Sequence, residues 1–305
     1  MLKTESTYVA RPALEHAIRS AVLGRKRLLL AGRVGSGRKT VLCHTLIAAG
    51  FSPQIVDLAG VLQMSDVTPA FRNALAVVAR AAKPHRIAPA LLVCNLDGCR
   101  GLADEGEIVG AVRARLQLVQ SPAVFYTAAD PDFIDRHCAN PRGSFFKQCT
   151  ILPVGALEPV AVDEIVLALT GTSLDALVRA VIVDAVGLYA SDLKVLITRQ
   201  VAARAGREPL TIPGVQAVLR HLVQERRSQY AAWLHGLSGH QRAVLTAFAR
   251  GTPLRATQDM ALASGVPVRS LVSTIMALQR NGCLTKEGDR SLFRDPFLRL
   301  HLLAL

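Results

Sequence analysis

A glycine-rich stretch near the N-terminus constrains the fold of this chain more than any other feature. Residues 32–40 read Gly-Arg-Val-Gly-Ser-Gly-Arg-Lys-Thr and follow the apolar run 28–31. A phosphate-binding loop has the pattern G-x-x-x-x-G-K-[ST], in which backbone N–H groups surround phosphates, the lysine reaches the β and γ oxygens and the hydroxyl binds Mg²⁺. Gly32 and Gly37 have the required spacing, and Gly35 adds a flexible point. The stretch predicts a loop between a buried strand and a helix.

The loop departs from the pattern at the position of the lysine. Arg38 stands there, and Lys39 and Thr40 follow one position late. Two interpretations stay open. Either the loop bulges by one residue and uses Lys39 and Thr40, or Arg38 replaces the lysine and the hydroxyl is lost. ATP with Mg²⁺ is the cofactor that such a loop would bind.

Strands and helices are expected to alternate over the first half of the chain. Apolar runs that predict strands lie at 28–31, 54–58, 89–95, 123–127 and 150–153, and helical patterns lie at 11–23, 40–49, 68–82, 107–119 and 132–138. This alternation predicts an α/β fold with a parallel sheet covered on both faces. Ligands bind such sheets beyond the carboxyl ends of the strands.

The strand pattern stops after Pro159. Helical periodicity continues over 160–170, 173–186, 191–203 and 212–233, and then over 238–250, 257–264 and 268–281. A strand, turn and strand over 283–294 complete the pattern of a winged helix, with 268–281 as its recognition helix. We therefore expect a P-loop base domain at 1–155, a helical lid domain at 156–233 and a winged-helix domain at 234–305.

A P-loop ATPase also needs an acidic pair at the end of a buried strand, to hold Mg²⁺ and to orient the attacking water. The run 91–94 ends instead in Asn95-Leu96-Asp97. An amide supplies no anionic ligand and a leucine orients no water, so we expect no autonomous ATPase activity. Asp97 could reach a metal only indirectly. Thr127 is either a polar sensor near the γ-phosphate or an ordinary strand-end threonine.

Three aspartates, at 130, 132 and 135, lie at the start of the helix expected over 132–138. Carboxylates favour helix N-termini, so we interpret this cluster as helix capping rather than as acid–base machinery.

The basic residues are concentrated toward the two ends of the chain. The net charge is +13; residues 1–40 carry 9 basic and 2 acidic groups, 41–198 carry 12 and 15, and 233–305 carry 9 and 4. This asymmetry indicates contact with a polyanion such as double-stranded DNA, although solubility alone is the alternative explanation. The DNA-binding candidates on the expected recognition helix and wing are Arg269, Arg280, Lys286, Arg290 and Arg294. Winged helices also act as protein–protein modules, which keeps that interpretation open.

Composition excludes some classes of protein. No apolar run approaches the roughly 18 to 20 residues of a membrane helix, and the first ten residues contain no apolar signal core. Six cysteines form no C-x-x-C pair, so neither a metal knuckle nor a disulfide framework is expected. We expect an intracellular, soluble protein with no membrane partner.

Several motifs in order resemble the AAA+ initiator ATPases, and among them the subunit 4 family of the eukaryotic origin recognition complex. Residues 29–42 look like its P-loop hhhGPRGSGKThh, and residues 57–63 with Asp66 resemble its hLNGLLQxxD stretch. Residues 90–97 are similar to its second ATPase strand, and 234–238 resemble the hHGLS that opens its winged helix. The resemblance covers nearly the whole chain.

The resemblance implies a role in DNA replication. Such a subunit would belong to a hetero-oligomeric ring in the nucleus that clasps origin DNA and helps load the replicative helicase. It would bind ATP without needing to hydrolyse it. Its family lends an arginine from an S-R-F sequence to the ATPase site of a neighbour. Here Phe145 follows Ser144 in that place, so Arg142 or Lys147 would have to substitute.

Two other classes compete with this interpretation. An AAA+ signal-transduction or transposition-helper ATPase shares the P-loop, the lid and the winged helix, but would need an intact acidic pair for switching. A catalytically inactive scaffold would need no DNA contact, which the basic C-terminal segment disfavours.

Overall fold

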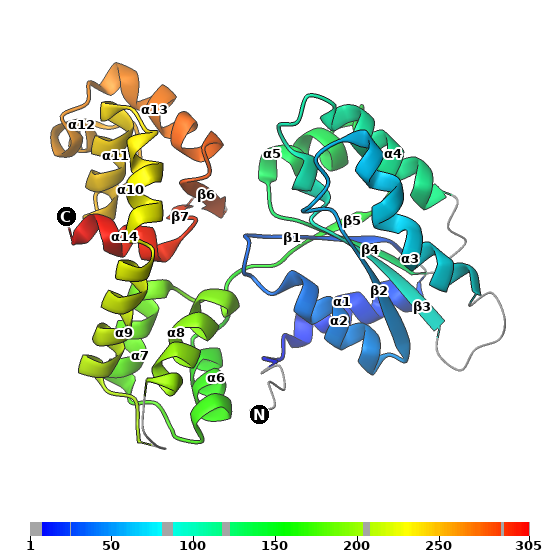
Figure 1. Cartoon of the computed structure of the whole chain (residues 1–305), viewed down its shortest axis with the longest axis horizontal. Helices are drawn as coiled ribbons and strands as arrows, with labels where there is room; N and C mark the ends of the chain where they lie inside the picture. Colours follow the sequence, from blue (N-terminus) through cyan, green and yellow to red (C-terminus); the bar gives the residue numbers. More distant parts are fainter. Residues whose placement is uncertain are drawn as a thin grey trace. The chain divides into compact units, whose positions relative to one another are not determined.

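The computed structural model describes residues 8–24, 26–80, 88–117, 123–203, 208–287 and 290–304. These residues form two compact units: Tyr8–Gly155 is the first, and the second comprises the described residues from Ala156 onward (Figure 1). The helix ends expected at 81–82 and 118–119 and the turn expected at 288–289 lie outside the described residues.

A five-stranded parallel sheet lies at the centre of the first unit. Its order is β2-β3-β4-β1-β5, so β1, which leads into the glycine-rich loop, lies between β4 and β5. The strands are β1 (Leu28–Ala31), β2 (Phe51–Asp57), β3 (Ala88–Cys94), β4 (Val124–Ala128) and β5 (Thr150–Pro153). The predicted α/β fold with a parallel sheet is confirmed.

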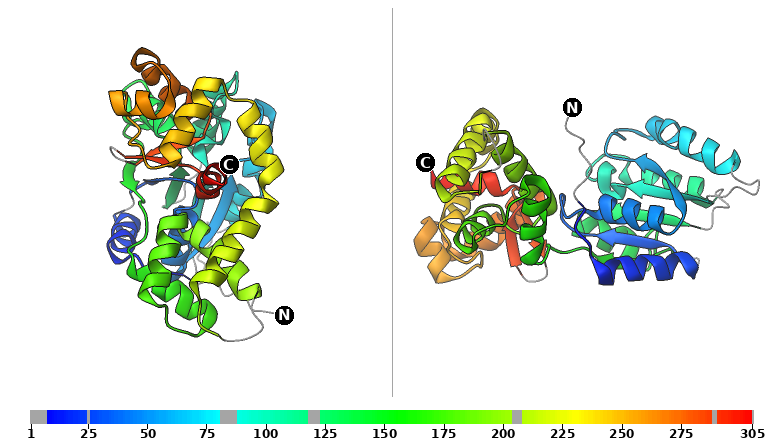
Figure 2. Two further views of the ribbon diagram at one scale, coloured as in Figure 1. Left: turned by 90° about the vertical axis from the view of Figure 1, so that its left-hand side faces the viewer. Right: turned by 90° about the horizontal axis from the view of Figure 1, so that it is seen from below.

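Helices cover both faces of this sheet (Figure 2). α1 (Pro12–Leu23) and α2 (Arg38–Ala48) pack on one face. The opposite face is covered by α3 (Val67–Arg80), α4 (Glu105–Gln117), α5 (Pro131–Ile134) and the π-helical η3 (Asp135–Ala139). Short 3₁₀ turns, η1 (Met64–Asp66) and η2 (Leu96–Cys99), follow β2 and β3.

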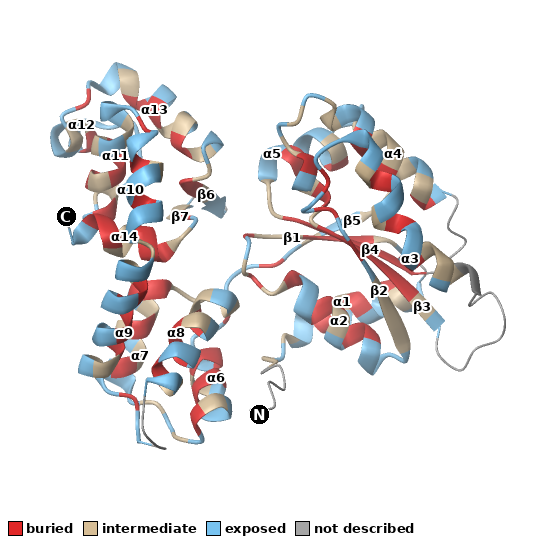
Figure 3. Cartoon of the chain, viewed as in Figure 1, coloured by how far each residue is buried: buried red, intermediate tan, exposed pale blue. Residues whose placement is uncertain are grey.

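Two apolar cores result from the alternation of side chains along the strands. Leu28 and Leu30 of β1 pack with Leu42 of α2 on one face, whereas Leu29 packs with Phe71 of α3 on the other. Each such side chain contributes about 1.5–3 kcal/mol when it leaves water. Because every central strand is buried on both faces (Figure 3), its sequence is apolar throughout rather than alternating.

The second unit begins with five helices. They are α6 (Val160–Thr170), α7 (Ala176–Val186), α8 (Ala190–Ala202), α9 (Ile212–Glu225) and α10 (Arg227–His235). The single helix predicted over 212–233 is wrong, because the chain breaks at Arg226. The Arg226 guanidinium lies 4.6 Å over the ring of Phe297 and 3.3 Å from the Asp295 carboxylate. The residue at the break therefore contacts a segment about seventy residues later in the chain.

Residues 239–304, here called the C-terminal module, complete the second unit. α11 (Gly239–Ala249), α12 (Gln258–Ser264) and α13 (Val268–Arg280) pack on one another. An antiparallel hairpin of β6 (Leu284–Glu287) and β7 (Arg290–Phe293) follows, and then α14 (Pro296–Leu303), a helix that the periodicity did not reveal. Three helices and a hairpin are the elements expected from the sequence.

The helix α14 ties the C-terminal module to the preceding helices. It packs against α7, α9 and α11. Asp295 caps its N-terminus and accepts a hydrogen bond of 2.6 Å from the Tyr230 hydroxyl. Arg299 donates to the carbonyl of Asp184, at 2.8 Å. The regions that the sequence separates at 233/234 therefore form one compact unit.

Within the described ranges no single helix has the length and hydropathy needed to cross a bilayer. α12 and α13 reach that threshold only when taken together, and the chain bends by 78° between them.

Candidate nucleotide site and basic surface

The glycine-rich loop joins β1 to α2 in a conformation that depends on its glycines. Gly35 and Gly37 both have φ of 86°, in the left-handed region that side chains rarely adopt. Gly37 is the N-cap of α2, with no side-chain cap, and the first turn of the helix contains no acidic residue. The first N–H groups of this helix are therefore available to an anion, which the helix dipole favours.

Gly32 fixes the root of the loop by close approach to β5. A Cβ at this position would lie 2.2 Å from the carbonyl oxygen of Val154, a distance that real Cβ atoms do not adopt. The Gly32 N–H also donates to the carbonyl of Ala128, at 3.2 Å. The first glycine of the motif is thus required for packing at the sheet edge.

The start of α2 favours a loop without a bulge. The helix begins at Arg38, directly after Gly37, so Arg38 occupies the position of the motif lysine and Lys39 occupies that of the hydroxyl residue. The Arg38 side chain is buried, whereas Lys39 and Thr40 are exposed. The helix start and this burial agree with the in-register interpretation, and both interpretations stay predictions. Which side chain contacts a phosphate stays a prediction.

Two residues that sequence reasoning missed help to build this site. Arg11, just before α1, donates to the carbonyl of Ser36 at 2.7 Å and to that of Gly155 at 3.1 Å, which links the loop to the end of the unit. The Ser36 side chain is fully buried, and its hydroxyl has no hydrogen-bond partner among the described residues. No spacing in the sequence marks Arg11, because its partners lie 25 and 144 residues away.

The second ATPase motif forms a turn without an acidic pair. Asn95 directly follows β3 with φ of 54°. Its backbone N–H donates to the Thr127 hydroxyl at 3.0 Å, and its side-chain amide donates to the Asp57 carboxylate at 2.8 Å. Leu96 is buried in the core. The turn thus connects the carboxyl ends of β2, β3 and β4 through neutral donors.

Asp97 and Thr127 both accept hydrogen bonds from backbone N–H groups of the first unit. One carboxylate oxygen of Asp97 accepts hydrogen bonds from the backbone N–H groups of Ala129 and Asp130, at 2.9 and 2.8 Å. Thr127 pairs with Leu30 of β1 in the sheet, two residues before Gly32, and is buried. The structure therefore brings Thr127 close to the loop, while Asp97 supports the turn after β4.

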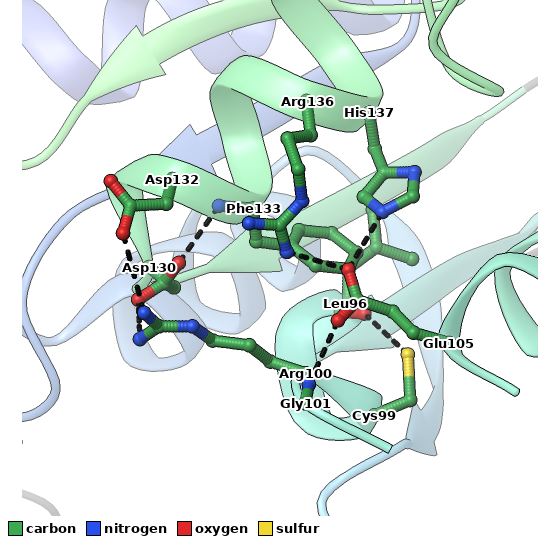
Figure 4. Close-up of polar contacts among 10 residues, drawn as sticks. All are labelled: Leu96, Cys99, Arg100, Gly101, Glu105, Asp130, Asp132, Phe133, Arg136 and His137. Atoms are coloured by element: carbon green, nitrogen blue, oxygen red, sulfur yellow. Dashed lines mark hydrogen bonds and ion pairs between the residues drawn. The ribbon is translucent and has the colours of Figure 1, made fainter. Parts of the chain in front are cut away.

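An ion-pair network extends from this turn (Figure 4). The Arg100 guanidinium binds the carboxylates of Asp130 and Asp132. Asp130 also caps α5 by accepting from the N–H of Phe133 at 2.8 Å, which confirms the capping interpretation for this aspartate. The network holds the loop after β3 against the start of α5.

Glu105 forms the second half of the network. Its carboxylate accepts from the Gly101 N–H at 2.8 Å and from Arg136 at 2.6 Å, and lies 2.9 Å from His137 Nε2. Burial alone would raise the pKa of Glu105, but these hydrogen bonds and the Arg136 charge outweigh it and hold the pKa at about 2. The Glu105 carboxylate therefore has a structural role, as the hydrogen-bond and ion-pair partner of these groups.

The loop 140–149 carries the residues expected to act on a neighbouring subunit. Phe145 is buried, and its ring meets that of Tyr126 edge to face. Arg142 and Lys147 are exposed on either side of it. Lys147 has φ of 57°, and its ammonium lies 5.4 Å from the ring centroid of Phe146. The structure leaves both cations at the surface.

The five DNA-binding candidates of the C-terminal module are all exposed. Arg269 and Arg280 lie on one face of α13, about 16 Å apart along its axis because eleven residues separate them. Arg294 reaches the end of this helix, since its Nη1 lies 3.1 Å from where a Cβ on Gly282 would be. Lys286 and Arg290 lie near the end of the hairpin. Four of the five candidates thus lie at the C-terminal end of α13 and on or next to the hairpin, whereas Arg269 lies at the start of α13.

Apolar side chains interrupt this basic surface. Val272 and Met276 are 56% and 55% exposed, between the two arginines on the outer face of α13. On the inner face of the same helix, Leu271 and Leu278 are fully buried. Exposed apolar side chains often lie at protein–protein interfaces, so Val272 and Met276 support the alternative of a protein-binding role for the module.

No protein-family model matches the sequence, and no curated protein is significantly similar to it. Solved structures match over nearly the full length. A Walker-type ATPase of Pyrococcus abyssi superposes with a TM-score of 0.65 at 11% identity, covering 99% of this chain and 98% of that one. The Orc2 protein of Aeropyrum pernix, solved as ADPNP–ADP complexes, gives 0.54 at 13% identity, covering 97% and 95%.

Identities this low establish the fold and nothing beyond it. The parallel sheet, the loop between β1 and α2 and the following helices together match those of P-loop ATPases. The chain has the AAA+ P-loop ATPase fold.

Proposed function

We propose that this chain is a nucleotide-binding subunit of a replication-initiator assembly of the origin recognition complex type, acting on double-stranded DNA in the nucleus. The observation that carries the proposal is the full-length fold. The chain has a P-loop unit, a helical region and a basic helix–hairpin module in the order the sequence resemblance implies, and it superposes on the Orc2 protein of Aeropyrum pernix over 97% of its residues. The finer assignment, to subunit 4 of the eukaryotic complex, rests on the sequence motifs.

The loop residues fit the phosphates of a nucleotide. The left-handed glycines at 35 and 37 and the start of α2, which has no side-chain cap, are the backbone features that bind phosphate in such loops. The buried Ser36 hydroxyl, which has no partner among the described residues, provides a further polar group. Arg38 supplies a cation in the register of the motif lysine. The phosphates of a bound ATP would accept hydrogen bonds from these donors and would balance the positive charge of Arg38.

The chain is proposed to hold a nucleotide without hydrolysing it. Hydrolysis needs a group that orients water beside the γ-phosphate, and Asn95 and Leu96 stand where the acidic pair belongs. We expect the purified chain to release no phosphate from ATP above background. Turnover that disappears in Asp97→Ala would contradict this claim.

Contact with DNA is assigned to the basic residues of the C-terminal module. Exposed arginines and lysines neutralise phosphates, which makes binding salt-dependent. We expect Arg269→Glu combined with Arg290→Glu to weaken duplex binding about tenfold or more near 100 mM salt. Arg220→Glu, an equal charge change at an exposed position of α9, is the control. Equal affinity of the double variant and the parent would remove the DNA assignment.

The neighbour-activating role is proposed for Arg142 or Lys147, since Phe145 is enclosed in the core. In a reconstituted assembly, Arg142→Ala or Lys147→Ala should slow ATP turnover at the adjacent subunit. Normal turnover in the double variant would leave this chain without a role at that site.

A second candidate is a self-contained regulator ATPase of the same fold. It is favoured by one observation: the Walker-type ATPase superposes better than the Orc2 protein. Affinity purification from native cells, with mass spectrometry of the co-purifying chains, separates the two. Recovery of other initiator subunits supports the proposed function, and their absence with self-association of the chain supports the regulator. A fluorescent fusion tests the nuclear location.

A further inference from the structure

The register of α2 places a second cation where P-loop proteins have a hydroxyl. The first three helical residues are Arg38, Lys39 and Thr40, and Gly37 precedes them as the N-cap. In the motif the hydroxyl residue directly after the phosphate-binding lysine ligates Mg²⁺. Lys39 occupies that position, and Thr40, one residue further along the helix, points in a direction rotated by about 100°.

The opposite side of the site also lacks an anionic metal ligand. Asn95 is neutral, and its amide nitrogen donates to Asp57 rather than offering an oxygen there. The same Asp57 oxygen accepts from the N–H of Ala59, at 3.0 Å. Asp97 is held by two backbone N–H groups. Among the residues that the structure describes, no group of three or more His, Cys, Asp or Glu side chains could hold a metal ion. At the two positions that hold Mg²⁺ in the motif, Lys39 offers no oxygen and Asn95 offers no carboxylate, so these two residues do not fit the ion.

Lys39 is the second residue of α2 and directly follows the residue in the position of the motif lysine. Burial raises the pKa of Cys94, the last residue of β3, to about 11, and the positive charge of Lys39 acts against this rise. The negative charge of the Asp57 carboxylate raises the pKa of the same thiol. The start of α2 puts Lys39 in the sequence position whose side chain ligates the metal in the P-loop motif.

We propose that this chain binds the phosphates of a nucleotide without a divalent cation, with the Lys39 ammonium in the place of Mg²⁺. The inference rests on the proposed nucleotide-binding function and specifies its cofactor requirement. Arg38 and Lys39 then provide two adjacent positive charges for the phosphate oxygens. An ammonium polarises no attacking water as a metal does, which agrees with a site that holds a nucleotide and does not consume it.

The test is a titration of the purified full-length chain with a mant-labelled ATP, once with excess EDTA and once with excess Mg²⁺. We expect the two dissociation constants to agree within about twofold. A loss of tenfold or more in EDTA would overturn the proposal while leaving nucleotide binding intact. The absence of binding in both conditions would reject the nucleotide-binding function itself, and this inference with it.

Variants at Lys39 sharpen the test. Lys39→Thr removes the charge and provides the hydroxyl of the motif, so affinity in EDTA should fall about tenfold or more, while Lys39→Arg should retain it. Lys26→Thr, at an exposed lysine outside the loop, is the matched control. Because Lys39 is exposed, thermal unfolding of all three variants should match that of the parent. Parental affinity of Lys39→Thr in EDTA would show that the ammonium does not replace the metal.

Discussion

The ring of Phe145 meets the ring of Tyr126 edge to face, with centroids 5.4 Å apart and planes inclined by 66°. Both side chains are fully buried in the core between the sheet and α4. The loop 140–149 is thereby anchored by an aromatic residue. An arginine at this position would place a charge in an apolar core if the loop kept this conformation. The loop can therefore bury position 145 as phenylalanine or expose it as arginine, but it cannot do both.

Truncation of Phe145 should destabilise the first unit. Phe145→Ala removes a fully buried ring, and we expect a loss of about 3–5 kcal/mol in unfolding free energy, measured by urea denaturation. Phe146→Ala, one residue later at a partly buried ring, is the control and should cost about 1 kcal/mol or less. Equal effects would mean that the Tyr126 contact does not anchor the loop.

Substitution of the first loop glycine should disrupt the site through packing. Gly32→Ala places a methyl group 2.2 Å from the Val154 carbonyl oxygen, so the loop or β5 must shift. We expect a lower melting temperature together with loss of mant-nucleotide binding. Gly60→Ala is the control, since nothing lies within 4 Å of its added Cβ. A Gly32→Ala variant with parental stability would contradict the close approach described here.

Acid stability should depend on Glu105. Its pKa is about 2 in the folded chain against an ordinary value of 4.5, so it stabilises the fold above pH 4.5 and this contribution disappears as the pH falls toward 2. Thermal melts between pH 6 and 2 should show a shallower decline in Glu105→Gln than in the parent, from a lower starting stability. Glu107→Gln, at an exposed position in the same helix, should keep the parental slope.

The contact between Tyr230 and Asp295 should couple α10 to α14. A double-mutant cycle with Tyr230→Phe and Asp295→Asn isolates it, because Asn can still cap the helix. We expect a coupling energy of about 1–2 kcal/mol, as for hydrogen bonds to charged groups. Additive effects in urea denaturation would show that the 2.6 Å hydrogen bond adds no stability.

The sequence predicted the elements whose signals are local. Each strand of the sheet was expected from an apolar run, and strand boundaries differ by three residues or fewer. The glycine spacing predicted the loop, because left-handed backbone at 35 and 37 requires glycine. Asp130 was expected to cap a helix and does so.

Features set by distant contacts escaped prediction. The break at Arg226 depends on Asp295, 69 residues later. The role of Asp97 depends on backbone N–H groups more than thirty residues away. The sequence could not decide the register of the loop either, because Arg38 and Lys39 both carry a positive charge that can bind phosphate. Only the start of α2 and the burial of Arg38 distinguish them.

The position of α14 has a mechanical consequence. Asp295 and Arg299 connect this last helix to α10 and α7, and the Tyr189 hydroxyl reaches Glu287 at the hairpin. These contacts join α7, α10, α14 and the hairpin within one compact unit. We therefore expect a shift of α7 or α10 to change the placement of the basic hairpin, and with it the surface that the hairpin can contact.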